Sequence, residues 1–273
     1  MDEFTRANRN VWNEWTHINA RSDLYRLEAF KAGEIKLNSL ERDEVGDVSG
    51  KTLLHLQCHF GMDTLSWARL GALVTGVDFS EDAIALAKRL SEELKIPARF
   101  ICSDIYALDE VLQEQFDIVY TSYGVLCWLP DIRRWAKIVA DRVRPGGFFY
   151  IAEFHPFAQV FDETIDELIV RYPYFEKEMT KWQVEGSYAD RDAYVESNFE
   201  YEWNHTLGEI VTALIEAGLT IDFLHEWPYS VYNQFPFLQP DGKGKWNPPE
   251  TPSMIPYMFS LRAHKGIQET HSG

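Results

Sequence analysis

Thr52-Leu-Leu-His-Leu-Gln-Cys-His-Phe-Gly61 begins the part of the chain that decides the fold, and Ala72-Leu-Val-Thr-Gly-Val-Asp78 ends it. The first five residues form an apolar run of strand length, and Gly61 falls where the chain must turn. Between the two stretches, apolar residues recur at helical spacing, and Gly71 suits the end of a helix. Two parallel strands joined by one helix form a nucleotide-binding half of a doubly wound sheet.

Asp78 and the loop before Gly61 indicate which ligands fit this unit. A carboxylate at the end of the second strand suits a ribose, because it can accept hydrogen bonds from two neighbouring hydroxyl groups. A pyrophosphate-binding loop needs three glycines, whereas Gln57 and His59 occupy two of the three positions here. The sequence therefore favours S-adenosylmethionine over a dinucleotide and leaves an NAD-dependent oxidoreductase as the less favoured alternative.

Strands and helices alternate along the next part of the chain. Ser80 is a good N-cap, acids follow it in the first turn of a helix, and Pro97 ends that helix. Further strands are predicted at residues 98–102, 115–121 and 148–153, a helix at 131–143 and a turn over 143–147. A helix at 206–217 and strands at 219–227 and 255–264 complete the pattern. This alternation predicts an α/β fold with a parallel sheet.

Two segments lie outside this alternation. Residues 1–48 are predicted to be a helical cap, with Trp12 and Trp15 on one face of its first helix and a second helical stretch at 21–45. Residues 155–203 are rich in aromatic and acidic side chains. At about 50 residues they are too long for an ordinary connection, so the sequence predicts an insertion with structure of its own.

Composition limits the partners of the chain. Its 273 residues carry a formal net charge of −17, and 45% of them are hydrophobic, which fits a single domain over residues 1–273 with a sizeable core. The acidic charge predicts that nucleic acid is not a partner. Three cysteines without a Cys-x-x-Cys pair predict neither a disulfide framework nor a metal site. Without a signal region or an apolar run of membrane length, a cytoplasmic location with no membrane partner is predicted.

The loop and the strand ends together resemble a known family. Leu-Gln-Cys-His-x-Gly resembles a variant of motif I of the class I S-adenosylmethionine-dependent methyltransferases, whose usual form is acid-x-Gly-x-Gly-x-Gly. His55 stands at the acid position of that motif. Asp104 matches the family's adenine-contacting acid, and Arg144-Pro-Gly-Gly147 resembles its signature before strand five. The ordered set of matches covers residues 50–155 well and residues 205–265 by architecture only.

The resemblance implies a Rossmann-like sheet of seven strands, mostly parallel with the last strand antiparallel, and helices on both faces. It also implies S-adenosylmethionine as the cofactor and methyl transfer to a small molecule by in-line displacement. Asp78 and Asp104 could instead serve only as capping residues. The implied cofactor-binding residues are Gln57, Cys58, His59, Gly61, Asp78, Phe79, Asp104, Ile105 and Thr121.

The family places its substrate above the carboxyl ends of its fourth and fifth strands, which are predicted here at residues 115–121 and 148–153. His155 has an ordinary pKa in the range of a general base, although Glu-Phe-His-Pro could instead only shape a turn. The insertion and residues 228–252 are expected to wall this pocket, with the insertion and the two N-terminal tryptophans as a lid. A non-catalytic cofactor-binding protein and a homodimer remain open. The implied substrate-pocket residues are Trp12, Trp15, Tyr123, Trp128, Glu153 and His155.

Overall fold

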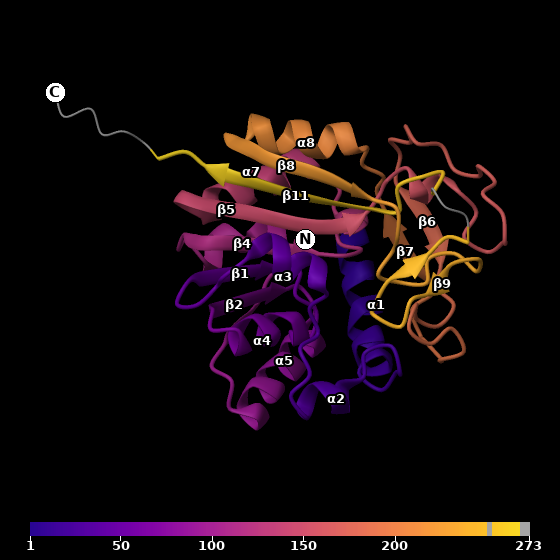
Figure 1. Ribbon diagram of the computed structural model, residues 1–273. Coiled ribbons are helices and arrows are strands. Elements are labelled where there is room, and N and C mark those ends of the chain that lie inside the picture. Colours follow the sequence, from indigo (N-terminus) through magenta and orange to yellow (C-terminus); the bar gives the residue numbers. More distant parts are fainter. Residues whose placement is uncertain (250–252, 268–273) are drawn as a thin grey trace.

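A seven-stranded sheet forms the centre of the molecule in the computed structural model, which describes residues 1–249 and 253–267. The strand order is β3-β2-β1-β4-β5-β11-β8 (Figure 1). β1 to β5 run parallel, and β11 lies antiparallel between β5 and β8. The predicted doubly wound sheet is therefore confirmed. Its strands are β1 (Thr52–Leu56), β2 (Leu73–Asp78), β3 (Arg99–Cys102), β4 (Phe116–Ser122), β5 (Val143–Phe154), β8 (Leu219–Trp227) and β11 (Met258–Lys265).

Helices cover both faces of the sheet, because successive side chains of each strand point to opposite faces. On one face Phe149 packs in a cluster with Trp135 of α7 and Leu214 of α8. On the other face Tyr150 packs in a cluster with Trp67 of α4. These helices are α4 (Met62–Arg69), α5 (Glu81–Leu94), α6 (Leu108–Val111), α7 (Ile132–Arg142) and α8 (Leu207–Glu216).

The N-terminal cap consists of three separate helices. They are α1 (Glu3–Asn19), α2 (Leu27–Lys31) and α3 (Ser39–Val45). The prediction of one helical stretch over residues 21–45 is therefore wrong. Gly33 takes a φ of +114°, which an α-helix cannot contain, and a capping box between Asn38 and Glu41 starts α3 anew.

The start of β5 differs from the predicted turn over residues 143–147. Val143 already pairs with Phe116, and Phe148 pairs with Ile118, so the residues between them form an irregularity within the strand. Gly147 is confined there, because a Cβ atom would lie 2.7 Å from the carbonyl oxygen of Asp117. A bulge paired to β4 thus replaces a free turn.

The insertion, residues 155–203, packs against α1. It contains a short 3-10 turn, η3 (Ala158–Val160), and an antiparallel hairpin of β6 (Thr180–Gln183) and β7 (Phe199–Glu202). The side chain of Asn8 exchanges two hydrogen bonds with the backbone of Tyr201, at 2.7 and 2.8 Å. In Figure 1, α1 lies between the sheet and the lobe that holds β6, β7 and β9 (Gln239–Pro240).

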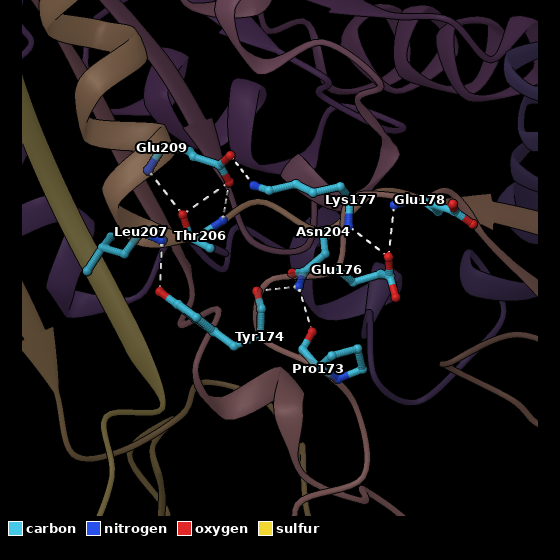
Figure 2. Close-up of polar contacts among 9 residues, drawn as sticks. All are labelled: Pro173, Tyr174, Glu176, Lys177, Glu178, Asn204, Thr206, Leu207 and Glu209. Atoms are coloured by element: carbon cyan, nitrogen blue, oxygen red, sulfur yellow. Dashed lines mark hydrogen bonds and ion pairs between the residues drawn. The ribbon is translucent and has the colours of Figure 1, made fainter.

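The insertion is also tied to the start of α8 (Figure 2). The backbone N–H of Leu207 donates to the hydroxyl of Tyr174 at 3.1 Å, and Asn204 donates to the carbonyl oxygen of Tyr174 at 3.0 Å. Lys177 forms an ion pair with Glu209 in the first turn of α8. The insertion is therefore attached to two helices, α1 of the N-terminal cap and α8 of the sheet.

Residues 228–252 form the connection between β8 and β11. β9 pairs with the two-residue strand β10 (Trp246–Asn247). Val231 and Tyr232 lie against the larger of the two cavities described below, in agreement with the expectation for this segment. Residues 250–252 lie outside the described residues, as do residues 268–273 of the predicted single domain.

Candidate active site

Two adjoining cavities lie at the carboxyl end of the sheet. The first, of about 230 Å³, is lined by the loops that follow β1, β2, β3 and β4. The second, of about 600 Å³, lies between α1, the loop after β4 and the insertion. The residues that line both include Trp12, Tyr25, Asp63, Tyr123, Trp128 and Tyr188. A molecule in one cavity can therefore meet a molecule in the other at this shared boundary.

The loop after β1 keeps a glycine-like backbone without the glycines. Gln57 and His59 have φ values of 56° and 51°, in the left-handed region that glycine normally occupies. Gly61 has a φ of 78°, and a Cβ atom there would lie 2.7 Å from the ring of Phe100. Of the three positions that are glycine in the usual motif, only Gly61 has a neighbour that excludes a side chain. Gln57 and His59 keep the same backbone conformation as glycine would, at the cost of local strain.

Side chains of this loop form part of the first cavity. The amide of Gln57 donates to the carbonyl oxygen of Val125 at 2.9 Å, and its Oε1 is buried with no partner among the described residues. His59 Nδ1 lies 3.1 Å from the hydroxyl of Tyr25, while its Nε2 is likewise buried and unpartnered. Burial lowers the pKa of His59 to about 3, so its ring is neutral at pH 7. Burial raises the pKa of the Cys58 thiol, which is inert as a nucleophile in this form.

Asp78 joins the loop to the start of α5. Its carboxylate accepts the backbone N–H of His59 at 2.8 Å and that of Ser80 at 2.9 Å. Burial raises its pKa to about 6. Asp78 and Phe79 line the first cavity, where a carboxylate that accepts two backbone donors still has lone pairs for a ligand.

Asp104 caps a turn and also lines the first cavity. It accepts the backbone N–H of Tyr106 at 2.9 Å and so caps the 3-10 turn η1 (Ile105–Ala107). It also lines the first cavity together with Ile105. Of the nine predicted cofactor-binding residues, Thr121 alone does not line this cavity. It is buried, and its hydroxyl donates to the carbonyl oxygen of Leu56 at 3.0 Å, which joins two strands of the sheet.

Glu153 positions the site without lining either large cavity. Its carboxylate accepts the backbone N–H groups of Val125 at 2.8 Å and Phe154 at 2.7 Å, and that of Gly124 as well. Burial raises its pKa even though these donors favour the ionised form. The predicted role of Glu153 as a substrate contact is thus replaced by one of holding the loop after β4.

His155 lies away from both cavities. Its Nε2 is 2.9 Å from a carboxylate oxygen of Glu226, and its Nδ1 accepts the backbone N–H of Phe157 at 3.0 Å. The ring is buried, and burial lowers its pKa. The structure therefore does not bring His155 to the position of a general base, and the alternative that this segment shapes a turn describes it better.

Aromatic side chains separate the two cavities. Trp12 and Trp15 share one face of α1, with ring centroids 5.3 Å apart. The Trp12 ring is 5.4 Å from that of Trp128 and 6.1 Å from that of Tyr188. Tyr123 lines both cavities and donates from its hydroxyl to Glu41 at 2.8 Å. Four of the six predicted substrate-pocket residues are therefore assembled here.

Several residues of the site escaped prediction. Asp63 lines both cavities, and its pKa rises to about 7 because of burial and then of the charge of Glu41. The hydroxyls of Tyr25 and Tyr188 form a hydrogen bond between segments far apart in sequence. Asp63 stands two residues after Gly61, and this closeness to the predicted ligand loop could have identified it from the sequence. The two tyrosines come together only in the tertiary fold.

Two structural features concern other ligands. Within residues 1–249 and 253–267, no group of three or more His, Cys, Asp or Glu side chains has an arrangement that could hold a metal ion. In the same residues, no helix has the length and apolar character needed to cross a membrane.

Comparisons with known proteins agree with this geometry. Residues 54–151 match the methyltransferase domain family. The ubiquinone biosynthesis O-methyltransferase of Coxiella burnetii (strain Dugway 5J108-111) is 35% identical over 105 residues, which are 38% of this chain and 44% of that protein. The chain thus spans less than half the length of this curated relative.

Solved structures extend the likeness to most of the chain. An S-adenosylmethionine-dependent methyltransferase from Mesorhizobium loti has a TM-score of 0.59 at 19% identity, covering 86% of this chain and 100% of the other. A glycopeptide N-methyltransferase complexed with S-adenosylmethionine has a TM-score of 0.54 at 17% identity, covering 85% and 96%. At these identities the likeness shows the fold.

Residues 54–151 are therefore identified as a methyltransferase domain, and most of the chain shares the fold of solved S-adenosylmethionine-dependent methyltransferases. The family resemblance inferred from the sequence is confirmed. The matches support S-adenosylmethionine as the cofactor and methyl transfer as the class of reaction.

Proposed function

We propose that this protein transfers the methyl group of S-adenosylmethionine to a small-molecule acceptor. The observation that carries the proposal is the shared boundary of the two cavities. A cofactor in the first cavity and an acceptor in the second would meet there, beside Asp63, Trp12 and Trp128. An NAD-dependent oxidoreductase is disfavoured, because the loop lacks the glycines that a pyrophosphate requires.

The first cavity fits the chemistry of this cofactor. S-adenosylmethionine carries a sulfonium and an ammonium, and three carboxyl groups, those of Asp63, Asp78 and Asp104, line the cavity. Asp78, which lines the cavity at the end of β2, would accept hydrogen bonds from the ribose hydroxyls. The buried, unpartnered Oε1 of Gln57 and Nε2 of His59 offer further polar contacts within the same loop.

The chain's own residues would orient the reactants and exclude water. When bound, the cofactor supplies an electrophilic methyl group together with its leaving group. The aromatic boundary of Trp12, Trp128 and Tyr188 restricts water at the reacting centre. Asp63, with a pKa of about 7, takes the place proposed from the sequence for His155, because it can accept a proton near neutral pH.

Calorimetric titration with S-adenosylmethionine, S-adenosylhomocysteine and NAD tests the cofactor. Binding of the first two ligands and not of NAD is expected. Binding of NAD alone would refute the proposal. Turnover of a methyl acceptor, followed as release of S-adenosylhomocysteine, separates an enzyme from a cofactor-binding protein that performs no transfer.

The cap and the insertion are proposed to act as a lid. α1 contacts the insertion through Trp15, whose Nε1 donates to Gly186 at 2.7 Å, and contacts the start of α5 through Asn13, whose Oδ1 accepts from Ser80 at 2.6 Å. Hydrogen-exchange mass spectrometry with and without S-adenosylhomocysteine tests this role. Slower exchange of residues 184–188 with ligand is expected. Strong protection of the insertion in the free protein, unchanged by ligand, would identify a rigid subdomain instead.

The remaining partner predictions rest on composition. We propose that the protein does not bind nucleic acid, on the basis of its net charge of −17, and a gel-shift assay with tRNA and duplex DNA tests this. A cytoplasmic location is proposed from three free cysteines, of which Cys102 is exposed. We also propose that the protein forms a homodimer, and sedimentation analysis tests this.

A further inference from the structure

The second cavity has an unusual excess of carboxyl groups. Asp63, Glu163, Glu185, Glu200 and Glu202 line it, against two basic residues, Lys36 and Arg191. The ammonium of Lys36 lies 3.6 Å from a carboxylate oxygen of Glu34, outside the lining, so part of its charge is already balanced. The cavity therefore favours a positively charged occupant over an anionic one.

β7 directs two of these acids into the cavity. Glu200 and Glu202 are two residues apart on the strand, so they share one face. The opposite face carries Phe199 and Tyr201. Lys181 Nζ lies 3.5 Å from the ring centroid of Phe199, and the Tyr201 ring packs 5.0 Å from that of Phe4 in α1. Hairpin register and helix packing thus set the direction in which the two acids point.

Glu200 lacks a partner that its position requires. Its Oε2 atom is buried and accepts no hydrogen bond from any residue that the structure describes. A buried carboxylate oxygen without a donor is costly, and a ligand with N–H groups would supply the donor. Burial raises the pKa of Glu200 to about 8 and that of Glu202 to about 7. A bound ammonium group would favour the ionised forms of both acids and so bind with release of a proton near neutral pH.

The wall of the cavity provides a second means of holding a cation. Trp12, Trp15, Trp128 and Tyr188 line it, and their ring centroids lie 5.3–6.1 Å apart in neighbouring pairs. Aromatic faces attract ammonium groups, and the same surface accommodates an apolar skeleton. The acid pair lies outside residues 54–151, the part that matches the methyltransferase domain family.

We propose that the methyl acceptor is a small amine, with a protonated or alkylated amino group held by Glu200 and Glu202 and an apolar portion held by the tryptophans. The inference rests on the proposed function, since it assigns the second cavity to the acceptor. It also predicts that carboxylate and phosphate compounds bind poorly in this cavity, because five acidic side chains line it against two basic ones.

Matched probes on two skeletons test the inference. Calorimetry at saturating S-adenosylhomocysteine compares 2-phenylethylamine, 2-phenylethanol and phenylacetate, and then tryptamine, tryptophol and indole-3-acetate. On at least one skeleton the amine is expected to bind at least tenfold more tightly than the alcohol, and neither acid is expected to bind. Equal or tighter binding of the alcohols or acids, or binding of neither amine, overturns the proposal.

Variants separate the acid pair from general effects. Glu200→Gln combined with Glu202→Gln is expected to weaken amine binding at least tenfold and to leave the affinity for S-adenosylhomocysteine unchanged, which also reports an intact fold. Glu178→Gln, an exposed acid of the same insertion outside the cavity, is the control and should behave as wild type. Unchanged amine affinity in the double variant overturns the proposal. Failure of the wild-type protein to bind S-adenosylhomocysteine refutes the proposed function itself.

Discussion

The two cavities of the site are built in different ways. The first is formed mainly by loops within residues 57–125, each directly after a strand of the parallel sheet, and backbone conformation sets its shape. The second depends on side chains from α1 and the insertion, separated by up to about 190 residues and joined by contacts such as Asn8 with Tyr201. Local geometry thus defines the cofactor side, whereas tertiary packing defines the acceptor side.

Gly61→Ala should have the largest effect, because it attacks the backbone geometry of the first cavity. A Cβ atom would lie 2.7 Å from Phe100 in a left-handed conformation. We expect a loss of about 1–3 kcal/mol in the free energy of unfolding and loss of cofactor binding. Denaturant unfolding and calorimetry measure both. The control is Gly208→Ala in α8, where no atom lies within 4 Å of the added Cβ. Equal stability of the two variants would contradict the argument.

Asp78→Ala removes a side chain of the first cavity while leaving the sheet in place. It should weaken binding of S-adenosylhomocysteine at least tenfold, because charge-assisted hydrogen bonds are worth roughly 1.5–3 kcal/mol. The second cavity should be unaffected, so protection of the β6–β7 hairpin against hydrogen exchange in the free protein should match wild type. Wild-type affinity in this variant would mean that Asp78 serves only the loop and the start of α5.

Lowering the pH should weaken cofactor binding through the same carboxylate. The pKa of Asp78 is raised from 3.8 to about 6. Below pH 6 the carboxylate becomes protonated and accepts hydrogen bonds from the ligand less well, so the affinity for the cofactor should fall by up to about tenfold per pH unit. In the unliganded protein the sign is opposite. The folded state binds this proton more tightly than the unfolded chain does, so this group's contribution to stability is present below about pH 4 and is lost as pH rises through about 6.

Calorimetry from pH 5 to pH 8 checks this dependence. Asp78→Asn should flatten it, whereas Asp63→Asn controls for the other carboxyl group of the cavity that titrates near neutrality. A pH profile unchanged by Asp78→Asn would assign the dependence to another group.

His155→Gln should have the smallest effect. The ring lies outside both cavities and bonds to Glu226 and Phe157, so we expect turnover within about threefold of wild type and a modest loss of stability. Steady-state kinetics with any accepted substrate measures this. A hundredfold fall in kcat at unchanged stability would place His155 in the reaction after all.

The sequence was most informative where function depends on the end of a strand. Asp78, Asp104 and the loop at Gly61 were predicted from neighbours a few residues away, and all line the first cavity. Glu153 was recognised as an acid at the same edge of the sheet, but its role depends on N–H groups 27–29 residues earlier in the chain. His155 was misjudged because its partner, Glu226, lies on a strand 71 residues later.

The acids of the insertion had no local signal. Glu200 and Glu202 face the second cavity only because β7 pairs with β6 and the Tyr201 ring on its other face packs against Phe4 of α1. A pattern of alternating acidic and aromatic residues indicates that the two faces of a strand differ, but it does not indicate which face lines a cavity. That choice belongs to contacts between distant segments, which one sequence read along its length does not reveal.

Trp12 belongs to the walls of both cavities, and this has a thermodynamic consequence. Any ligand that shifts α1 in one cavity also alters the surface offered to the second ligand in the other. The two affinities are then linked, and linkage requires each ligand to change the affinity of the other by the same factor. Through this one tryptophan, a ligand that moved α1 would couple the occupancy of the two cavities, and the departure of either product would then influence the release of the other.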